Sequence, residues 1–239
     1  MQFLNKELAG EKGIEGVRKL ALDSGLFLLV DKDLEWTSFN VIGKMRGILN
    51  IKKIGHAGTL DPLATGLLLL GIGRGTKKLG ELTGLDKVYS GRIKLGATTE
   101  SDDREYPEIN PKDCSKISSE DIEKVRKEFL GKILQLPPRF SAKKIKGRKM
   151  YDMARKGQSF ERKESEVEIY SFEIIEFNNP IIKFKIHCSK GTYIRSIARD
   201  FGDKLGVGGY LLSLRREKIA NFEIGNAFTI SELENIFGD

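Results

Sequence analysis

The chain has 239 residues, of which 39% are hydrophobic and 31% are charged, a composition typical of a globular protein with a buried core. No apolar run approaches the roughly 20 residues needed to span a bilayer, and the first residues lack the apolar core of a signal peptide. The only cysteines, Cys114 and Cys188, form no CxxC pair, which argues against a zinc ribbon or a disulfide framework. We therefore expect a cytoplasmic protein without membrane contact.

The first half of the chain reads as a short series of strands and helices. Residues 1–24 are polar and predict a peripheral segment, and residues 25–32 form an apolar run that predicts a buried strand. Ser38 can cap a helix over residues 39–49, where apolar side chains recur at helical spacing. A glycine-rich polar stretch, residues 55–66, then leads into a second buried run at residues 67–73.

The second half adds more strands, separated by helices. We expect strands at residues 87–95, 166–177, 181–187 and 211–219. We expect helices from Ser118 to Leu130, where Ser118 and Asp121 resemble a capping box, over residues 149–156, from Gly191 or Thr192 to Leu205 and over residues 230–237. Strands and helices mixed in this order predict an α+β fold with a mostly antiparallel sheet.

The positive charge of the protein is concentrated in one stretch. The net charge is +7, and residues 139–163 contain ten Lys or Arg against Asp152 and Glu161, so this stretch alone carries 10 − 2 = +8. Such a stretch attracts polyanions, although a solvated surface is the alternative. Aromatic and small residues interrupt the charges, among them Phe140 and Tyr151, which favours a docking surface.

The most unusual segment is Gly55–Gly66. Its glycines permit positive φ and close backbone approach, and Asp61 precedes Pro62, which keeps its backbone extended. A carboxylate on a stiff, non-helical loop is suited to attack an electrophile, whereas the alternative is a simple turn former.

The complete string GHAGTLDPLATGLL resembles the signature of the TruB family of tRNA pseudouridine synthases. Further segments resemble the family's motifs in the same order, from residue 25 to residue 219: LLLVDK with Thr37-Ser38, Lys87-Val88-Tyr89, LGATTESDD, PPRFSAKKIKGRKMYDMAR, HCSKGTYIRSIARDFGDKLG and LRREKI. The resemblance implies the pseudouridine synthase fold, a central mixed sheet flanked by helices and loops. It also implies an active-site cleft across that sheet and a basic insertion that clamps RNA.

The resemblance also assigns the catalytic residues. Asp61 falls on the nucleophile, Tyr89 on the tyrosine that contacts the target base, and Arg195 on the arginine that pairs with the aspartate. The reaction is an isomerisation without electron or phosphate transfer, so we expect no cofactor and no metal. The implied partner is the T arm of tRNA, in which uridine 55 is converted by a monomer without guide RNA.

A further set of residues is expected to bind the RNA or the target nucleoside. His56 would fill the stack that the flipped base leaves, and Tyr193 and Leu214 would line the uracil pocket. Lys32 could contact RNA or support its strand, and both roles are open. The cations of the insertion complete the set: Lys143, Lys144, Lys146, Arg148, Lys149 and Arg155.

Three departures from the family pattern are visible. Asp33-Leu34-Glu35-Trp36 replaces the proline and glycine expected after Lys32, which predicts a different turn there. Phe140 stands where a tyrosine is usual. The domains we expect are a peripheral segment at 1–24 and a catalytic domain at 25–239 that includes an RNA-binding insertion at about 117–165. Because few residues follow Ile219, we expect no C-terminal PUA domain.

Other functions compete with this one. A guide-dependent pseudouridine synthase of the Cbf5 or dyskerin type shares the aspartate motif but works with a PUA domain and partner proteins and lacks the clamping insertion. A non-catalytic tRNA-folding protein could use the same scaffold, although Asp61, Tyr89 and Arg195 are retained. A generic basic RNA-binding protein is the third alternative.

Overall fold

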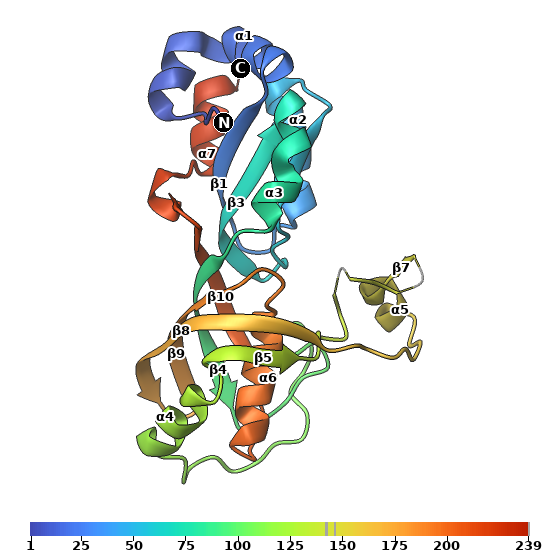
Figure 1. Cartoon of the computed structure of the whole chain (residues 1–239), viewed down its shortest axis with the longest axis vertical. Coiled ribbons are helices and arrows are strands. Elements are labelled where there is room, and N and C mark those ends of the chain that lie inside the picture. Colours follow the sequence, from blue (N-terminus) through green and yellow to red (C-terminus); the bar gives the residue numbers. More distant parts are fainter. Residues whose placement is uncertain (142, 146, 239) are drawn as a thin grey trace. The chain divides into compact units, whose positions relative to one another are not determined.

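The computed structural model describes residues 1–141, 143–145 and 147–238 (Figure 1). The chain divides into two compact units, the first made of Met1–Val88 with Arg215–Asp239 and the second of Tyr89–Leu214. Two strands, β4 (Lys87–Leu95) and β10 (Gly209–Ile219), begin in one unit and end in the other. Among the described helices, none is long and apolar enough to cross a bilayer.

The first unit is a small sheet with helices packed against it. Its elements, besides the ends of β4 and β10, are α1 (Lys6–Asp23), β1 (Leu26–Lys32), α2 (Ser38–Leu49), β2 (Ile54–Ala57), β3 (Ala64–Ile72), η1 (Gly73–Lys78), α3 (Leu79–Thr83), β11 (Phe222–Glu223), η2 (Ile224–Asn226) and α7 (Ile230–Phe237). Both β1 and β2 pair antiparallel with β3, and the register with β1 runs from Leu26↔Ile72 to Lys32↔Gly66.

Strands β1 and β3 contain unbroken apolar runs, at residues 26–30 and 67–70, because both faces of the sheet are covered. Leu68 and Leu70 of β3 pack into a core that α1, α2 and α7 share, whereas Leu67 and Leu69 pack into a second core with Leu82 of α3. The strict alternation of a half-exposed strand is therefore absent, which explains the continuous apolar runs in the sequence.

The N-terminal segment, expected to be peripheral, contributes to the first of these cores. Helix α1 buries Ala9, Val17 and Ala21 there, and the side chain of Asn5 caps its first turn. The helix is interrupted at Gly13, whose φ of 56° lies outside the helical region. Residues 6–23 are thus a structural part of the first unit.

The second unit contains a twisted sheet with two longer helices. Besides its parts of β4 and β10, its elements are α4 (Ser119–Lys127), β5 (Gly131–Gln135), β6 (Lys144–Ile145), β7 (Arg148–Lys149), α5 (Met150–Arg155), β8 (Ser165–Asn178), β9 (Ile181–Cys188) and α6 (Ile194–Lys204). Strand β8 pairs antiparallel with both β5 and β9. The predicted α+β fold with a mostly antiparallel sheet is therefore confirmed.

Of the two helix caps predicted from the sequence, one is confirmed and one is wrong. Ser118 caps α4 and forms a capping box with Asp121, as predicted. The prediction that Ser38 caps α2 is wrong, because Thr37 is the cap and bonds reciprocally with Asn40. This leaves the hydroxyl of Ser38 available for a different contact, described below.

Candidate active site

The loop that carries Asp61 lies in the first unit, between β2 and β3. Ser38, which is 2% exposed, holds this loop by one hydroxyl, which accepts a hydrogen bond from the Leu60 amide at 2.9 Å and donates one to the Leu60 carbonyl at 3.1 Å. The Thr37-Ser38 pair thus has two tasks, because Thr37 starts helix α2 and Ser38 fixes the residue before Asp61. Asp61 itself is half-buried.

Backbone and side-chain contacts also fix the loop on the other side of Asp61. The amide of Glu35 donates to the Pro62 carbonyl at 2.8 Å, and the amide of Ala64 donates to the Asp61 carbonyl at 3.1 Å. The guanidinium of Arg216, which is 1% exposed, donates to the carbonyls of Gly58 at 3.1 Å and Leu67 at 2.7 Å. The Asp61 loop is therefore held at both ends.

Lys32, the last residue of β1, contacts this loop through the Pro62 carbonyl. Its side chain is fully buried, and its ammonium donates to the carbonyls of Asp33 at 2.9 Å, Trp36 at 2.6 Å and Pro62 at 3.4 Å. Burial lowers the pKa of Lys32 to about 8, although the nearby charges of Asp61 and Asp33 act in the opposite direction. Of the two roles left open by the sequence, this placement favours support of the strand and loop.

The turn after Lys32 contains the Asp33-Leu34-Glu35-Trp36 departure from the family pattern. Glu35 stands where the motif has glycine, and its φ is 67°, in the left-handed region that glycine adopts without strain. The backbone conformation suited to glycine is thus present, although a glutamate occupies it. Glu35 therefore adopts a backbone conformation that is strained for a residue with a Cβ atom.

His56 is half-buried on β2, where it pairs with Leu70 of β3. Burial and the neighbouring charge of Arg216 lower its pKa, so the ring is neutral at neutral pH. Its Nδ1 is buried and has no hydrogen-bond partner among the described residues. A neutral, flat ring suits the predicted stacking on RNA, which stays a prediction.

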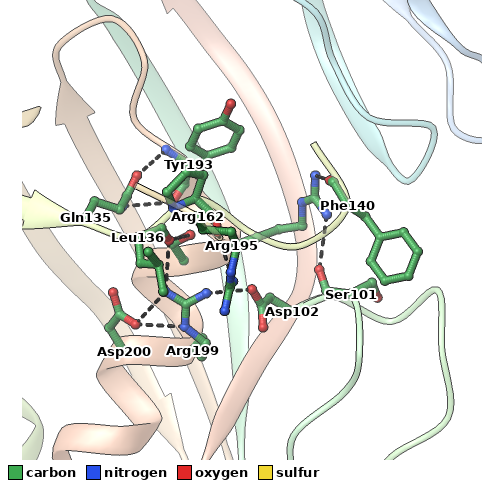
Figure 2. Close-up of polar contacts among 12 residues, drawn as sticks. Ser101, Asp102, Gln135, Leu136, Phe140, Arg162, Tyr193, Arg195, Arg199 and Asp200 are labelled. Atoms are coloured by element: carbon green, nitrogen blue, oxygen red, sulfur yellow. Dashed lines mark hydrogen bonds and ion pairs between the residues drawn. The ribbon is translucent and has the colours of Figure 1, made fainter. Parts of the chain in front are cut away.

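Arg195 lies in the second unit, at the second position of helix α6, and is 6% exposed (Figure 2). Its guanidinium donates to the carbonyl of Ser101 at 3.1 Å and to that of Phe140 at 2.7 Å, and its Nε lies 3.6 Å from a carboxylate oxygen of Asp103. The side chain is therefore oriented by two loops, one of which is the start of the basic stretch.

The other predicted pocket residues also lie in the second unit. Tyr89 is 8% exposed on β4, Tyr193 is half-buried directly before α6, and Leu214 is half-buried on β10. Asp61, His56 and Lys32 belong to the first unit. The convergence of Asp61 with Tyr89 and Arg195 on one substrate stays a prediction.

Within the basic stretch, β6 pairs antiparallel with β7, and the short helix α5 follows, which Figure 1 labels beside β7. Lys143, Arg148 and Arg155 are exposed, and the guanidinium of Arg155 lies over the ring of Tyr151. Lys144 of β6 pairs with Lys149 of β7, whereas Lys146 lies outside the described residues.

Phe140 is buried near the start of the basic stretch. It is 4% exposed and packs between the rings of Tyr106 and Tyr151, at centroid distances of 5.1 and 6.0 Å. A phenylalanine therefore suits this apolar position, and its carbonyl holds Arg195.

Sequence reasoning missed several residues that position the site. Arg216 lies in the family-like segment LRREKI, but nothing in the sequence indicates that it donates to the Gly58 carbonyl. The sequence predicts Ser38 as a helix cap, whereas its hydroxyl instead bonds to the Leu60 backbone. Among the described residues, no group of three or more His, Cys, Asp or Glu side chains is placed to hold a metal ion.

Comparisons with solved structures define the class of the protein. Over 95% of its length the chain superposes on one subunit of a Cbf5–Nop10–Gar1 complex with a TM-score of 0.72 and 26% identity, and it covers 57% of that subunit. A chain of an H/ACA RNP bound to a substrate RNA containing 2′-deoxyuridine gives a TM-score of 0.67 and 25% identity. The present chain spans little more than half of each. The fold is thus that of the pseudouridine synthases.

Sequence comparisons narrow the class to a family. The profile of the TruB family pseudouridylate synthase (N-terminal domain) matches residues 46–194. The tRNA pseudouridine synthase B of Chloroherpeton thalassium is 48% identical over 87% of this chain and 89% of its own length. That of Flavobacterium johnsoniae is 45% identical over 88% of this chain and 95% of its own length. The chain belongs to the TruB family of pseudouridylate synthases.

Proposed function

We propose that the protein converts uridine 55 in the T arm of tRNA to pseudouridine, with the carboxylate of Asp61 as nucleophile. The observation that carries the proposal is the likeness to relatives named tRNA pseudouridine synthase B. Eight of these relatives are 42–48% identical to the chain over 84–91% of its length. The motif that contains Asp61 lies on a loop held at both ends, as a positioned nucleophile requires.

The proposed reaction exchanges one bond to the ribose for another. The carboxylate of Asp61 attacks C1′ of the ribose and the C1′–N1 bond breaks. The C2′ proton then leaves as the Asp61 carboxylate is released, which gives a glycal intermediate, and C2′ regains a proton when the new bond to C1′ forms. The uracil then turns and a C1′–C5 bond replaces the lost one, while the C5 proton leaves and N1 gains a proton. Atoms and electrons balance without an oxidant, so the chain must supply a nucleophile, a base and a site that excludes water. Attack on the uracil ring is the alternative.

Tyr89 and Arg195 have distinct roles in this scheme. The ring of Tyr89 can stack on the uracil, and its phenol can accept or relay the proton that leaves C5. The guanidinium of Arg195, held by the carbonyls of Ser101 and Phe140, has a planar fork suited to a carboxylate, and we assign it to pair with Asp61.

The target base must leave its stack before a carboxylate can reach it, which costs a few kcal/mol. Phosphate contacts from the exposed cations Lys143, Arg148 and Arg155 would offset this cost, and the neutral ring of His56 would replace the lost stacking. The proposal therefore assigns binding to the basic stretch and chemistry to the Asp61 loop. We place the reaction in the cytoplasm and assign it to a monomer.

The decisive experiment incubates the purified chain with an unmodified tRNA transcript and maps pseudouridine by mass spectrometry after derivatisation. Product at position 55 without any guide RNA is expected. Product that forms only when a guide RNA is added would instead favour the guide-dependent alternative, and product at another uridine would overturn the assignment of position 55.

A variant separates catalysis from binding. Asp61→Asn is expected to give no product while its Kd for the tRNA stays within about threefold of the native value, because the change keeps the size of the side chain and removes the nucleophile. Full product from Asp61→Asn would refute the mechanism. Bound tRNA without product from the native chain would favour the tRNA-folding role.

Salt dependence tests the RNA-binding assignment. If Lys143 and Arg148 each contact one phosphate, their replacement by glutamine should reduce the slope of log K against log salt by about 1.4 to 1.8. The matched control replaces Lys12 and Lys19, which are exposed on α1 and lie outside the basic stretch. An equal loss of slope in the control would contradict an RNA footprint on the insertion.

A further inference from the structure

The segment that leads from β5 into the basic stretch, Gln135–Phe140, is joined to helix α6 by a row of hydrogen bonds that we call the α6 seam (Figure 2). At its first position, Gln135 forms two hydrogen bonds with one residue. Its amide oxygen accepts from the Tyr193 amide at 2.7 Å, and its amide nitrogen donates to the Tyr193 carbonyl at 3.1 Å.

These two hydrogen bonds lie at the start of helix α6. Tyr193 is the N-cap of α6, and its own side chain forms no capping hydrogen bond to the helix. The Tyr193 carbonyl also accepts the first bond of the helix, from Ile197 at 3.2 Å. Gln135 therefore fixes both polar groups of the residue from which the helix starts.

Gln135 is itself held in place. It is 1% exposed at the end of β5, where it pairs with Ser165 of β8. A glutamine buried in this way must find partners for its amide, because a buried amide without hydrogen bonds is costly. The amide can thus act as a rigid spacer between the sheet and the start of α6.

In the rest of the α6 seam, backbone carbonyls of the segment accept hydrogen bonds from side chains of the helix. The carbonyl of Leu136 accepts from Ser196 at 2.8 Å and from Arg199 at 3.0 Å, and Arg199 is in turn paired with Asp102 at 2.8 Å. At its far end the carbonyl of Phe140 accepts from Arg195 at 2.7 Å. Three residues of one segment therefore bond to the N-cap and the first two turns of the helix.

We infer that Gln135 is a positioning residue for the isomerisation, which acts by fixing the backbone of Tyr193 and, two residues later, the guanidinium of Arg195. The inference rests on the proposed function. It assigns Gln135 no contact with the substrate, since both polar atoms of its amide bond to Tyr193 and the residue is 1% exposed. An error of about 1 Å in the position of a catalytic group can lower a rate by two orders of magnitude, so a fixed helix start has kinetic value.

The test uses Gln135→Met, which keeps the length of the side chain and removes both hydrogen bonds. Single-turnover rates are measured with saturating enzyme on a tRNA transcript, together with the Kd for tRNA and the melting temperature. We expect a rate at least about tenfold below native with a Kd within about threefold, because the lost contacts orient the site rather than bind RNA. A rate within twofold of native would overturn the inference.

Two controls exclude a merely structural effect. Val167→Ala makes a cavity in β8, where Val167 is 4% exposed, and serves as a variant of similar stability loss whose rate should stay within twofold of native. A double-mutant cycle with Arg195→Lys then asks whether the two losses are coupled. If Gln135 acts through Arg195, the double variant should be clearly faster than the product of the two single effects predicts. Additive losses would overturn the inference.

If Gln135→Met does not fold, Gln135→Glu keeps an acceptor for the Tyr193 amide and, when ionised, puts a carboxylate oxygen in place of the donor to the Tyr193 carbonyl. Its rate should then fall below native and show the same coupling to Arg195→Lys. The native chain is measured in parallel: no pseudouridine from it refutes the proposed function, whereas normal native activity with an unaffected Gln135 variant refutes the positioning role alone.

Discussion

Removal of the Ser38 hydroxyl tests how the Asp61 loop is held. In Ser38→Ala, the amide and carbonyl of Leu60 both lose their partner in a place where Leu60 is 3% exposed and water has little access. Two net hydrogen bonds and one buried amide left without a partner amount to about 2–3 kcal/mol of unfolding free energy. For a chain of this size that corresponds to a fall of about 4–12 °C in melting temperature.

Calorimetry gives the melting temperature, and single-turnover pseudouridine formation gives the rate, which should fall because the residue before Asp61 is no longer fixed. Ser118→Ala is the matched control: it removes a hydroxyl from the exposed cap of α4 and should cost about 1 kcal/mol with an unchanged rate. A Ser38→Ala protein that melts within about 1 °C of native and keeps its rate would refute the idea that this hydroxyl holds the loop.

Other substitutions in the first unit have calculable effects. Glu35→Gly relieves a left-handed residue and should leave activity unchanged and raise the unfolding free energy in urea by up to about 1 kcal/mol; a loss of that size would contradict the strain at φ 67°. Arg216→Met removes the donors to Gly58 and Leu67 and should lower the same quantity by about 2–4 kcal/mol, whereas a loss below about 0.5 kcal/mol would show that the loop does not need them. The folded-state pKa of Lys32, about 8, lies below its ordinary 10.5, so the unfolded chain binds more protons between these values and stability should rise there with pH. Urea titrations from pH 7 to 11 should show this rise in the native protein relative to Lys32→Met; parallel curves would contradict it.

Most of the fold could be predicted from local signals in the sequence. The buried strands at β1 and β3 were visible as apolar runs, and the capping box at Ser118 marked the start of α4. The start of α6 was placed too early, at residue 191 or 192, since its helix begins at Ile194 and uses a glutamine from another strand instead of a local cap. A contact between residues 58 positions apart leaves no trace in local periodicity.

The candidate nucleophile could be predicted from a motif, but the residues that hold the site could not. The motif points to Asp61, whereas Ser38, Arg216 and Gln135 are identified only by the atoms they contact. Each of them is buried, polar and bonded to backbone atoms of a segment distant in the sequence. Such residues resemble ordinary surface residues in composition, and only the tertiary structure tells them apart.

The direction of these contacts explains why the chain tolerates its departure from the family motif after Lys32. The loop is held by side chains that bond to backbone groups, since Lys32 reaches the carbonyls of Asp33, Trp36 and Pro62. Every residue supplies a carbonyl, so the identity of residues 33–36 matters little as long as their backbone follows the same path. Glu35 is the exception because its φ favours glycine, and there the replacement costs stability rather than geometry. Substitutions of the donors, Lys32 foremost, should therefore impair the loop far more than substitutions of the residues that accept from them.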